Sequence, residues 1–242
     1  MVSIILARPD SPENIGLVAR AMKNTGFTDL RLAAVKGLGG KAYKTGVHAE
    51  DILASVRLFA SLEDAVADLD VVFAATARPR KNFPAMGLSE AVSKISAFPS
   101  RTRIGLLFGN ERTGLTSDEM RHSNFRYAIP QASRQPSYNL GAAVLLTLYH
   151  LFTRPDSPAP GTLPRPLSRR EQDEFLELLI RTLSDKGFIH KTNRRHAAEM
   201  IYDLFGRLTL TAKDRNLLLA IFYQGGAERA GSGRQIRQPG KP

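Results

Sequence analysis

The stretch PSYNLGAAVLLTLYHLF, residues 136–152, joins a polar loop directly to an apolar helix. Ser137 and Asn139 can accept hydrogen bonds from the free amides of a first helical turn, so capping of a plain core helix over 140–152 accounts for part of the pattern. The apolar run is too short to span a bilayer and contains Thr147 and His150. Whether the loop has a second role depends on the rest of the chain.

Ahead of this stretch, predicted strands and helices alternate. The strands are expected at 2–7, 30–35, 57–60, 70–77, 104–109 and 125–130, and the helices at 14–26, 48–56, 61–69 and from 116. The runs VSIILA, DVVFAATA and IGLLFG are continuously apolar, which is typical of strands buried on both faces of a parallel sheet. Residues 1–153 are therefore predicted to form one α/β domain, a parallel sheet with helices on both faces.

The remainder of the chain has a different pattern. Residues 154–167 contain five prolines and predict an extended linker. Residues 168–224 predict a helical extension of three amphipathic helices, two of which begin with capping boxes. Residues 225–242 are Gly-rich and basic, so we expect a disordered tail. Several basic residues stand near the predicted helix starts of the extension: Arg169, Arg170, Lys191, Arg194 and Arg195. We expect the linker to hold the extension away from the α/β domain without fixing it.

Composition narrows the class of partner. Lys and Arg number 34 against 23 acids, which gives a net charge of +11 and favours a polyanionic partner, nucleic acid before anionic membrane. The absence of cysteine excludes disulfides, Fe–S clusters and thiolate zinc sites. The five histidines lack metal-ligand spacing, so no metal is expected. Without a signal peptide or spanning segment, the chain is expected to be cytoplasmic, with no membrane partner.

A Gly-rich segment, GLGGKAYKTG at 37–46, invites a phosphate-loop interpretation. A Walker A loop requires Ser or Thr after the lysine, whereas Ala42 follows Lys41 here. No serine lies in a G-x-S-x-G elbow either. The sequence therefore disfavours an NTPase or a hydrolase.

Three polar clusters follow predicted strands, where parallel sheets bind their ligands. The first contains Asn14, Gly16 and Arg20. The second contains Gly109, Asn110, Glu111, Gly114 and Leu115. The third contains Ser137, Asn139 and Leu140.

In these clusters the chain resembles the SpoU/TrmH family of SPOUT RNA 2′-O-ribose methyltransferases, most closely its TrmJ-like tRNA branch. The first cluster is similar to the family's Asn-Gly-Arg motif, the second to its Gly-x-Glu motif, and the third to its Ser-x-Asn-Leu motif. The segment AATAR, 74–78, stands where TrmJ-like proteins have a cofactor-contacting loop. Tyr138 departs from the family's usual leucine.

The resemblance implies a trefoil knot near the end of the α/β domain and S-adenosylmethionine as cofactor. It implies a homodimer whose contact face is the helix 140–152. The residues implied to bind the cofactor are Ala75, Thr76, Ala77, Gly109, Glu111, Ile129, Pro136, Ser137, Tyr138 and Asn139. The implied catalytic residues are Arg20, Asn14 and Ser137. The candidate RNA contacts are Arg8, Arg78, Arg80, Arg194 and Arg195.

The family assigns removal of the ribose 2′-hydroxyl proton to the arginine that matches Arg20. The pKa of arginine, above about 12, makes it a poor base, so we favour phosphate binding and stabilisation of the developing oxyanion. The plain alternative is a surface ion pair of Arg20 with Asp10 or Glu13. Glu111 could orient Asn14 or a backbone amide. The implied substrate is tRNA in its anticodon loop; ribosomal RNA, or RNA binding without catalysis, are the alternatives.

Overall fold

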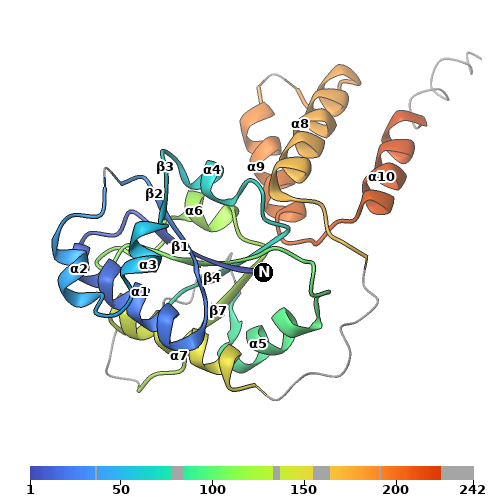
Figure 1. Ribbon diagram of the computed structural model, residues 1–242. Coiled ribbons are helices and arrows are strands. Elements are labelled where there is room, and N and C mark those ends of the chain that lie inside the picture. The colour runs from blue at the N-terminus through green and yellow to red at the C-terminus, as the bar shows by residue number, and fades with distance from the viewer. Residues whose placement is uncertain (36, 78–83, 133–136, 155–163, 191, 225–242) are drawn as a thin grey trace, which may run out of the picture.

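A seven-stranded parallel sheet runs through the computed structural model of the protein (Figure 1). The structure describes residues 1–242 except 36, 78–83, 133–136, 155–163, 191 and 225–242. The strands are β1 (Val2–Ala7), β2 (Asp29–Ala33), β3 (Arg57–Phe59), β4 (Val71–Ala75), β5 (Met86–Gly87), β6 (Ile104–Phe108) and β7 (Phe125–Ala128). Their order is β3-β2-β1-β6-β4-β7-β5, and the paired strands run parallel. β1, β6 and β4 are therefore central strands, which explains their continuously apolar sequences.

Helices cover both faces of this sheet, as the alternating sequence predicted. On one face lie α1 (Pro12–Thr25), α2 (Lys41–Thr45), α3 (Glu50–Ala54), α5 (Leu88–Ala97) and α7 (Leu140–Phe152). On the other lie α4 (Leu62–Val66) and α6 (Ser117–Arg121). Val72 and Phe73 are neighbours on β4, and each belongs to a different one of the two buried apolar clusters. That division follows from the alternation of side chains along a strand, and it confirms the predicted α/β fold.

Three elements lie where the sequence analysis expected none. They are α2, the two-residue strand β5 and α5. α5 buries Leu88, Val92 and Ile95, whose helical spacing was a signal that could have predicted it. α2 is a single short helix in the Gly-rich segment, too short for such a signal.

The loop before α7 caps that helix through Asn139. The Asn139 side-chain oxygen accepts a hydrogen bond from the Gly141 amide at 2.9 Å. α7 then packs against α1 and α5, and Thr147 meets the buried Tyr127 hydroxyl at 3.2 Å. The capping interpretation is therefore confirmed for Asn139.

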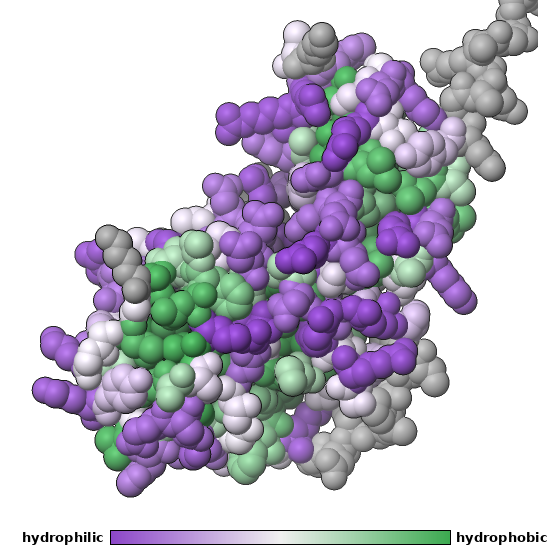
Figure 2. Space-filling view, turned by 45° about the horizontal axis from the view of Figure 1, so that its top comes forward, coloured by the Kyte–Doolittle hydropathy of each residue, from purple (hydrophilic) through white to green (hydrophobic). Residues whose placement is uncertain are grey.

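The helical extension consists of α8 (Arg169–Asp185), α9 (Arg194–Phe205) and α10 (Ala212–Gln224). A small apolar cluster that includes Leu176 and Leu210 holds it together. Figure 2 shows apolar side chains among polar ones on its surface, and Leu204 and Leu217 are among the exposed residues. In the part of the chain that the structure describes, no helix is both long and apolar enough to cross a membrane.

The extension contacts the α/β domain, contrary to the expectation that the linker holds it away. The Arg169 amide donates to the Leu69 carbonyl at 2.8 Å, and Arg121 of α6 pairs with Asp203 of α9 at 3.2 Å. Arg169 starts α8, as the sequence predicted, but it is only 2% exposed. A buried arginine at a helix start looks like a surface arginine in sequence. The expected linker lies mostly, and the expected tail wholly, outside the described residues.

Candidate active site

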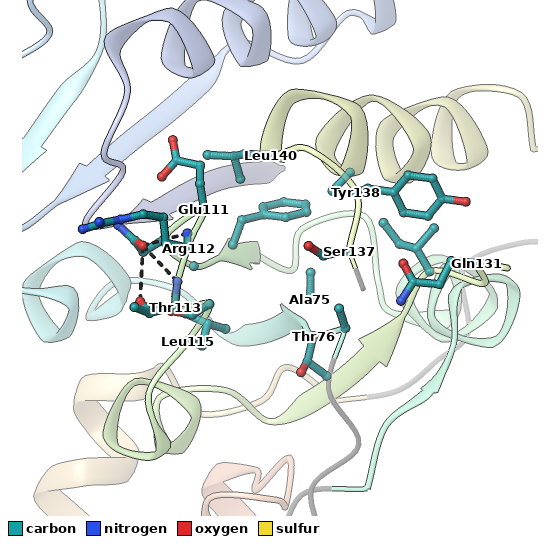
Figure 3. A pocket seen from close by; sticks show the side chains of 17 residues that line it. Ala75, Thr76, Glu111, Arg112, Thr113, Leu115, Gln131, Ser137, Tyr138 and Leu140 are labelled. Atoms are coloured by element: carbon teal, nitrogen blue, oxygen red, sulfur yellow. Dashed lines mark hydrogen bonds between the residues drawn. The ribbon is translucent and has the colours of Figure 1, made fainter. Parts of the chain in front are cut away.

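A pocket opens at the carboxyl ends of β4, β6 and β7, where the sequence analysis expected a site (Figure 3). Ala75 ends β4, Gly109 follows β6 and Ile129 follows β7. The residues lining the pocket are Ala75, Thr76, Ala77, Phe108, Gly109, Asn110, Glu111, Arg112, Thr113, Gly114, Leu115, Ile129, Gln131, Ser137, Tyr138, Leu140 and Ala143. Segments from three separate parts of the chain thus meet at one edge of the sheet.

The loop after β6 is tightly folded, and this fold requires a glycine at 109. A Cβ placed on Gly109 would lie 2.4 Å from backbone atoms of Gly114 and Leu115. The Asn110 side-chain oxygen accepts the amides of Arg112 at 3.0 Å and Thr113 at 3.1 Å. This leaves a wall of close-packed backbone at the pocket.

Glu111 links the first and second clusters. Its carboxylate accepts hydrogen bonds from the Asn14 side-chain amide at 2.8 Å and from the Asp10 amide at 2.8 Å. A third bond comes from the Ser11 amide at 3.3 Å. Glu111 therefore fixes the start of α1 and orients Asn14, the role that the sequence suggested.

Asn14 in turn links the first cluster to the third. Its side-chain oxygen accepts a hydrogen bond from the Asn139 side-chain amide at 3.0 Å. Since Asn139 also caps α7, both the oxygen and the nitrogen of its side-chain amide form hydrogen bonds. The chain Glu111–Asn14–Asn139 joins all three clusters, although they are far apart in sequence. Asn139 lies beside the pocket and is not among its lining residues.

The loop before α7 supplies Ser137 and Tyr138 to the pocket lining (Figure 3). The Tyr138 hydroxyl donates to the Pro130 carbonyl at 2.9 Å. Tyr138 is thus anchored to the segment that follows β7. Pro136, expected to bind the cofactor, lies outside the described residues.

Arg20 is exposed on α1 and does not line this pocket. Among the described residues, no hydrogen bond or ion pair involves its side chain. Its expected alternative partners are engaged elsewhere, since Asp10 pairs with Arg112 at 2.8 Å and Glu13 with Lys41 at 3.1 Å. The ion-pair alternative for Arg20 is therefore not found.

The arginines expected to contact RNA differ in whether their side chains are already paired or are exposed to solvent. Arg8 donates two hydrogen bonds to Glu119, at 2.6 and 2.8 Å, and this partner raises the pKa of Arg8. Arg194 and Arg195 are exposed at the start of α9. Arg78 and Arg80 lie outside the described residues.

Some lining residues were not expected from the sequence. Arg112 and Thr113 lie inside the second cluster, so its unbroken polar run GNERTG was the available signal. No sequence signal marked Ala143, because a small apolar residue in a core helix gives the same pattern whether or not it faces a pocket. No group of three or more potential metal ligands occurs within the described ranges.

Comparisons with known proteins agree on a family. Residues 1–149 match the model of the SpoU rRNA Methylase family. The tRNA (cytidine-2'-O-)-methyltransferase TrmJ of Methanocaldococcus jannaschii is 30% identical, over 92% of this chain and 98% of that protein. The tRNA (cytidine/uridine/adenosine-2'-O-)-methyltransferase TrmJ of Pseudomonas aeruginosa is also 30% identical, over 92% and 93%. The crystal structure of TrmJ from Z. mobilis ZM4 superposes with a TM-score of 0.79 at 28% identity, covering 93% and 98%.

Proposed function

Because the chain belongs to the SpoU rRNA methylase family, whose members use S-adenosylmethionine, we propose that it methylates the ribose 2′-hydroxyl of a tRNA. The observation that carries this proposal is the chain Glu111–Asn14–Asn139, which holds the three motif clusters around one pocket. The TrmJ relatives match both the α/β domain and the extension, which favours tRNA over ribosomal RNA. We place the target nucleotide in the anticodon loop.

The pocket fits the cofactor in its chemistry. Small and apolar side chains at Ala75, Ala77 and Ile129 suit an adenine ring, and the bare backbone at Gly109 allows close approach. Ser137 and Thr76 add hydroxyl groups for the polar parts. When bound, S-adenosylmethionine supplies a methyl group already activated by its sulfonium. The family and its structural neighbours also imply the trefoil knot that forms such a pocket.

We propose that a second copy of the chain completes the site, because Arg20 is not among the residues that line the pocket. α7 exposes Leu145, Tyr149 and Phe152, with 41, 55 and 60% of each residue accessible. These three residues recur at helical spacing and form an apolar face. Burying this face against a second α7 gives the homodimer that we propose. Arg20, on the adjacent α1, then serves the partner's pocket.

In this dimer Arg20 binds the phosphate beside the target nucleotide and stabilises the oxyanion that forms at the ribose 2′-oxygen. Asn14, held by Glu111, fixes the position of α1 relative to the loop before α7. Ser137 contacts the cofactor from the loop before α7.

Mass spectrometry of tRNA incubated with methyl-labelled S-adenosylmethionine tests this function. A labelled ribose methyl in the anticodon loop is expected. Arg20→Ala should lower kcat by about 10²–10³, with binding of S-adenosylhomocysteine unchanged in calorimetry. Label on ribosomal RNA alone would contradict the substrate, and no transfer to any RNA would leave an RNA-binding protein.

A further inference from the structure

The Gly-rich segment that failed as a phosphate loop forms an exposed basic and aromatic strip on α2. The strip consists of Lys41, Tyr43 and Lys44, of which Tyr43 is 45% exposed. Lys41 pairs with Glu13, yet 71% of its side chain remains accessible. A half-exposed aromatic ring between two lysines is a combination that suits a nucleic acid, whose bases stack and whose phosphates are anionic.

This strip is held rigidly against α1. Gly16 of α1 packs so closely on α2 that an added Cβ would lie 2.1 Å from the Thr45 hydroxyl and 2.2 Å from the Ala42 carbonyl. The Thr45 hydroxyl donates to the Glu13 carbonyl at 2.8 Å. A glycine at 16 therefore allows the backbone of α2 to approach α1 closely. The strip therefore cannot move independently of α1 without breaking this contact.

The strip packs on α1, the helix that also carries the proposed catalytic Arg20. Residues four apart on a helix share a face, so Arg20 follows Gly16 by about one turn along the face that meets α2. Figure 1 shows α2 lying beside α1. An RNA whose phosphate reaches Arg20 thus passes near Tyr43 and the two lysines.

We propose that the strip binds the substrate RNA next to the target nucleotide, with Tyr43 stacking on a neighbouring base and Lys41 and Lys44 contacting phosphates. This proposal rests on the proposed function, since it assigns part of the RNA-binding surface of the same site. Charge argues for RNA over a protein contact, because a dimer interface here would desolvate two lysines, of which only Lys41 pairs with an acid, Glu13.

Direct binding of tRNA and the KM for tRNA test the strip in the full-length protein. Tyr43→Ala should weaken tRNA binding about tenfold and raise KM alike, with kcat, cofactor binding and sedimentation unchanged. Tyr43→Phe keeps the ring and should match the wild type. Tyr43→Leu keeps apolar contact but has no aromatic face, so it should behave like Tyr43→Ala.

The contribution of the lysines is measured by the salt dependence of tRNA affinity. Lys44→Ala should reduce the slope of log affinity against log salt by roughly one. Arg101→Ala removes an exposed charge just before the amino end of β6, whereas the pocket lies at the carboxyl ends of the strands, and it should leave the slope unchanged.

Wild-type affinity in Tyr43→Ala, or in Tyr43→Leu, would overturn the proposal. A shift of Tyr43→Ala from dimer to monomer would instead identify the strip as a protein contact. Because tRNA binding is measured directly, the strip is tested even if the wild-type protein transfers no methyl group, which would overturn the proposed function alone.

Discussion

Gly109 shows how one residue without a side chain shapes the pocket wall. The backbone of Gly114 and Leu115 occupies the place where a Cβ would lie. Gly109→Ala must therefore shift this loop, and we expect a loss of about 1–3 kcal/mol in the free energy of unfolding together with weakened binding of S-adenosylhomocysteine. Denaturant unfolding and calorimetry measure the two effects.

Gly40→Ala is the matched control for this prediction. No atom lies within 4 Å of a Cβ at Gly40, whose φ of −62° suits alanine. It should bind cofactor normally and be as stable as the wild type, or slightly more stable. Equal cofactor affinity in both variants would show that the loop after β6 does not depend on close packing at 109.

Single residues were predictable where a motif carried them. Glu111 was expected to orient Asn14 or a backbone amide, and Asn139 to cap its helix; the structure shows both contacts and a further hydrogen bond between Asn14 and Asn139. Sequence could not show that they form one chain of contacts, because the pairs are separated by 97 and 125 positions. Arg20 was recognised from its motif, but only the fold shows that it does not line the pocket.

Among the elements, β2 carries a buried cation at the amino end of the sheet. Arg31 is 2% exposed; it hydrogen-bonds Asp68 and pairs with Asp29 at 3.2 Å. Burial by itself raises the pKa of both aspartates. Hydrogen bonds from Arg57 and Ser3 to Asp29, and from Arg31 to Asp68, more than offset that effect and lower both pKa values.

These lowered pKa values predict how stability depends on pH. Below the unfolded pKa, about 3.9, the unfolded chain binds protons more readily than the folded one. The contribution of the network is therefore complete above about pH 5 and is lost as the pH falls through the folded values. Arg31→Met should cost about 3 kcal/mol at pH 7 and flatten the acid limb of the stability profile.

Lys23→Met is the control variant for Arg31→Met. It removes an exposed pair with Asp51 at 2.7 Å, and it should change stability little. An acid limb as steep in Arg31→Met as in the wild type would show that other carboxylates dominate acid unfolding.

The exposed face of α7 gives a second prediction at this scale. Tyr149→Glu places a charge in the apolar face that we assign to the dimer, where it would be buried without a partner. Sedimentation should show monomers, and methyl transfer should fall with dimerisation because Arg20 no longer reaches a partner's pocket. Tyr223→Glu changes a tyrosine of nearly equal exposure, 54%, on α10 and should remain dimeric. A fully active monomer would contradict the shared site.

Elements were predictable where periodicity was strong. The central strands and α7 followed from their apolar runs, whereas α2 and β5 have five and two residues and leave no period to detect. The docking of the extension was not predictable, since it depends partly on main-chain contacts such as that of Arg169 with Leu69, and its ion pair, Arg121 with Asp203, joins residues far apart in sequence. Backbone groups have no sequence signature.

At the scale of the whole molecule, the docked extension raises the question of what its helices add. Asp70, whose side chain is wholly buried, pairs with Arg103 of the domain and with Arg165 ahead of α8, both at 3.0 Å. The pocket-lining residues all precede Thr153. The extension therefore stabilises the domain from outside the pocket while presenting Arg194 and Arg195 to solvent.

We expect these two arginines to hold the tRNA body. The double variant Arg194→Ala/Arg195→Ala should weaken tRNA binding and lower its salt slope by up to about two, because each arginine would neutralise one phosphate. Arg181→Ala, which removes an exposed arginine of α8 paired with Glu177 as Arg195 is with Glu199, should leave the slope unchanged.

Truncation after Phe152 separates this grip from a role in stabilising the dimer. If the extension grips tRNA, the truncated protein should remain dimeric and bind S-adenosylhomocysteine, because α7 and the pocket are intact. Its melting temperature should fall, because Asp70 loses its ion pair with Arg165 and the Leu69 carbonyl loses the Arg169 amide. Its tRNA affinity should fall further than in the double variant, with a shallower salt dependence. Monomers that no longer bind cofactor would instead identify the extension as a cap that stabilises the dimer.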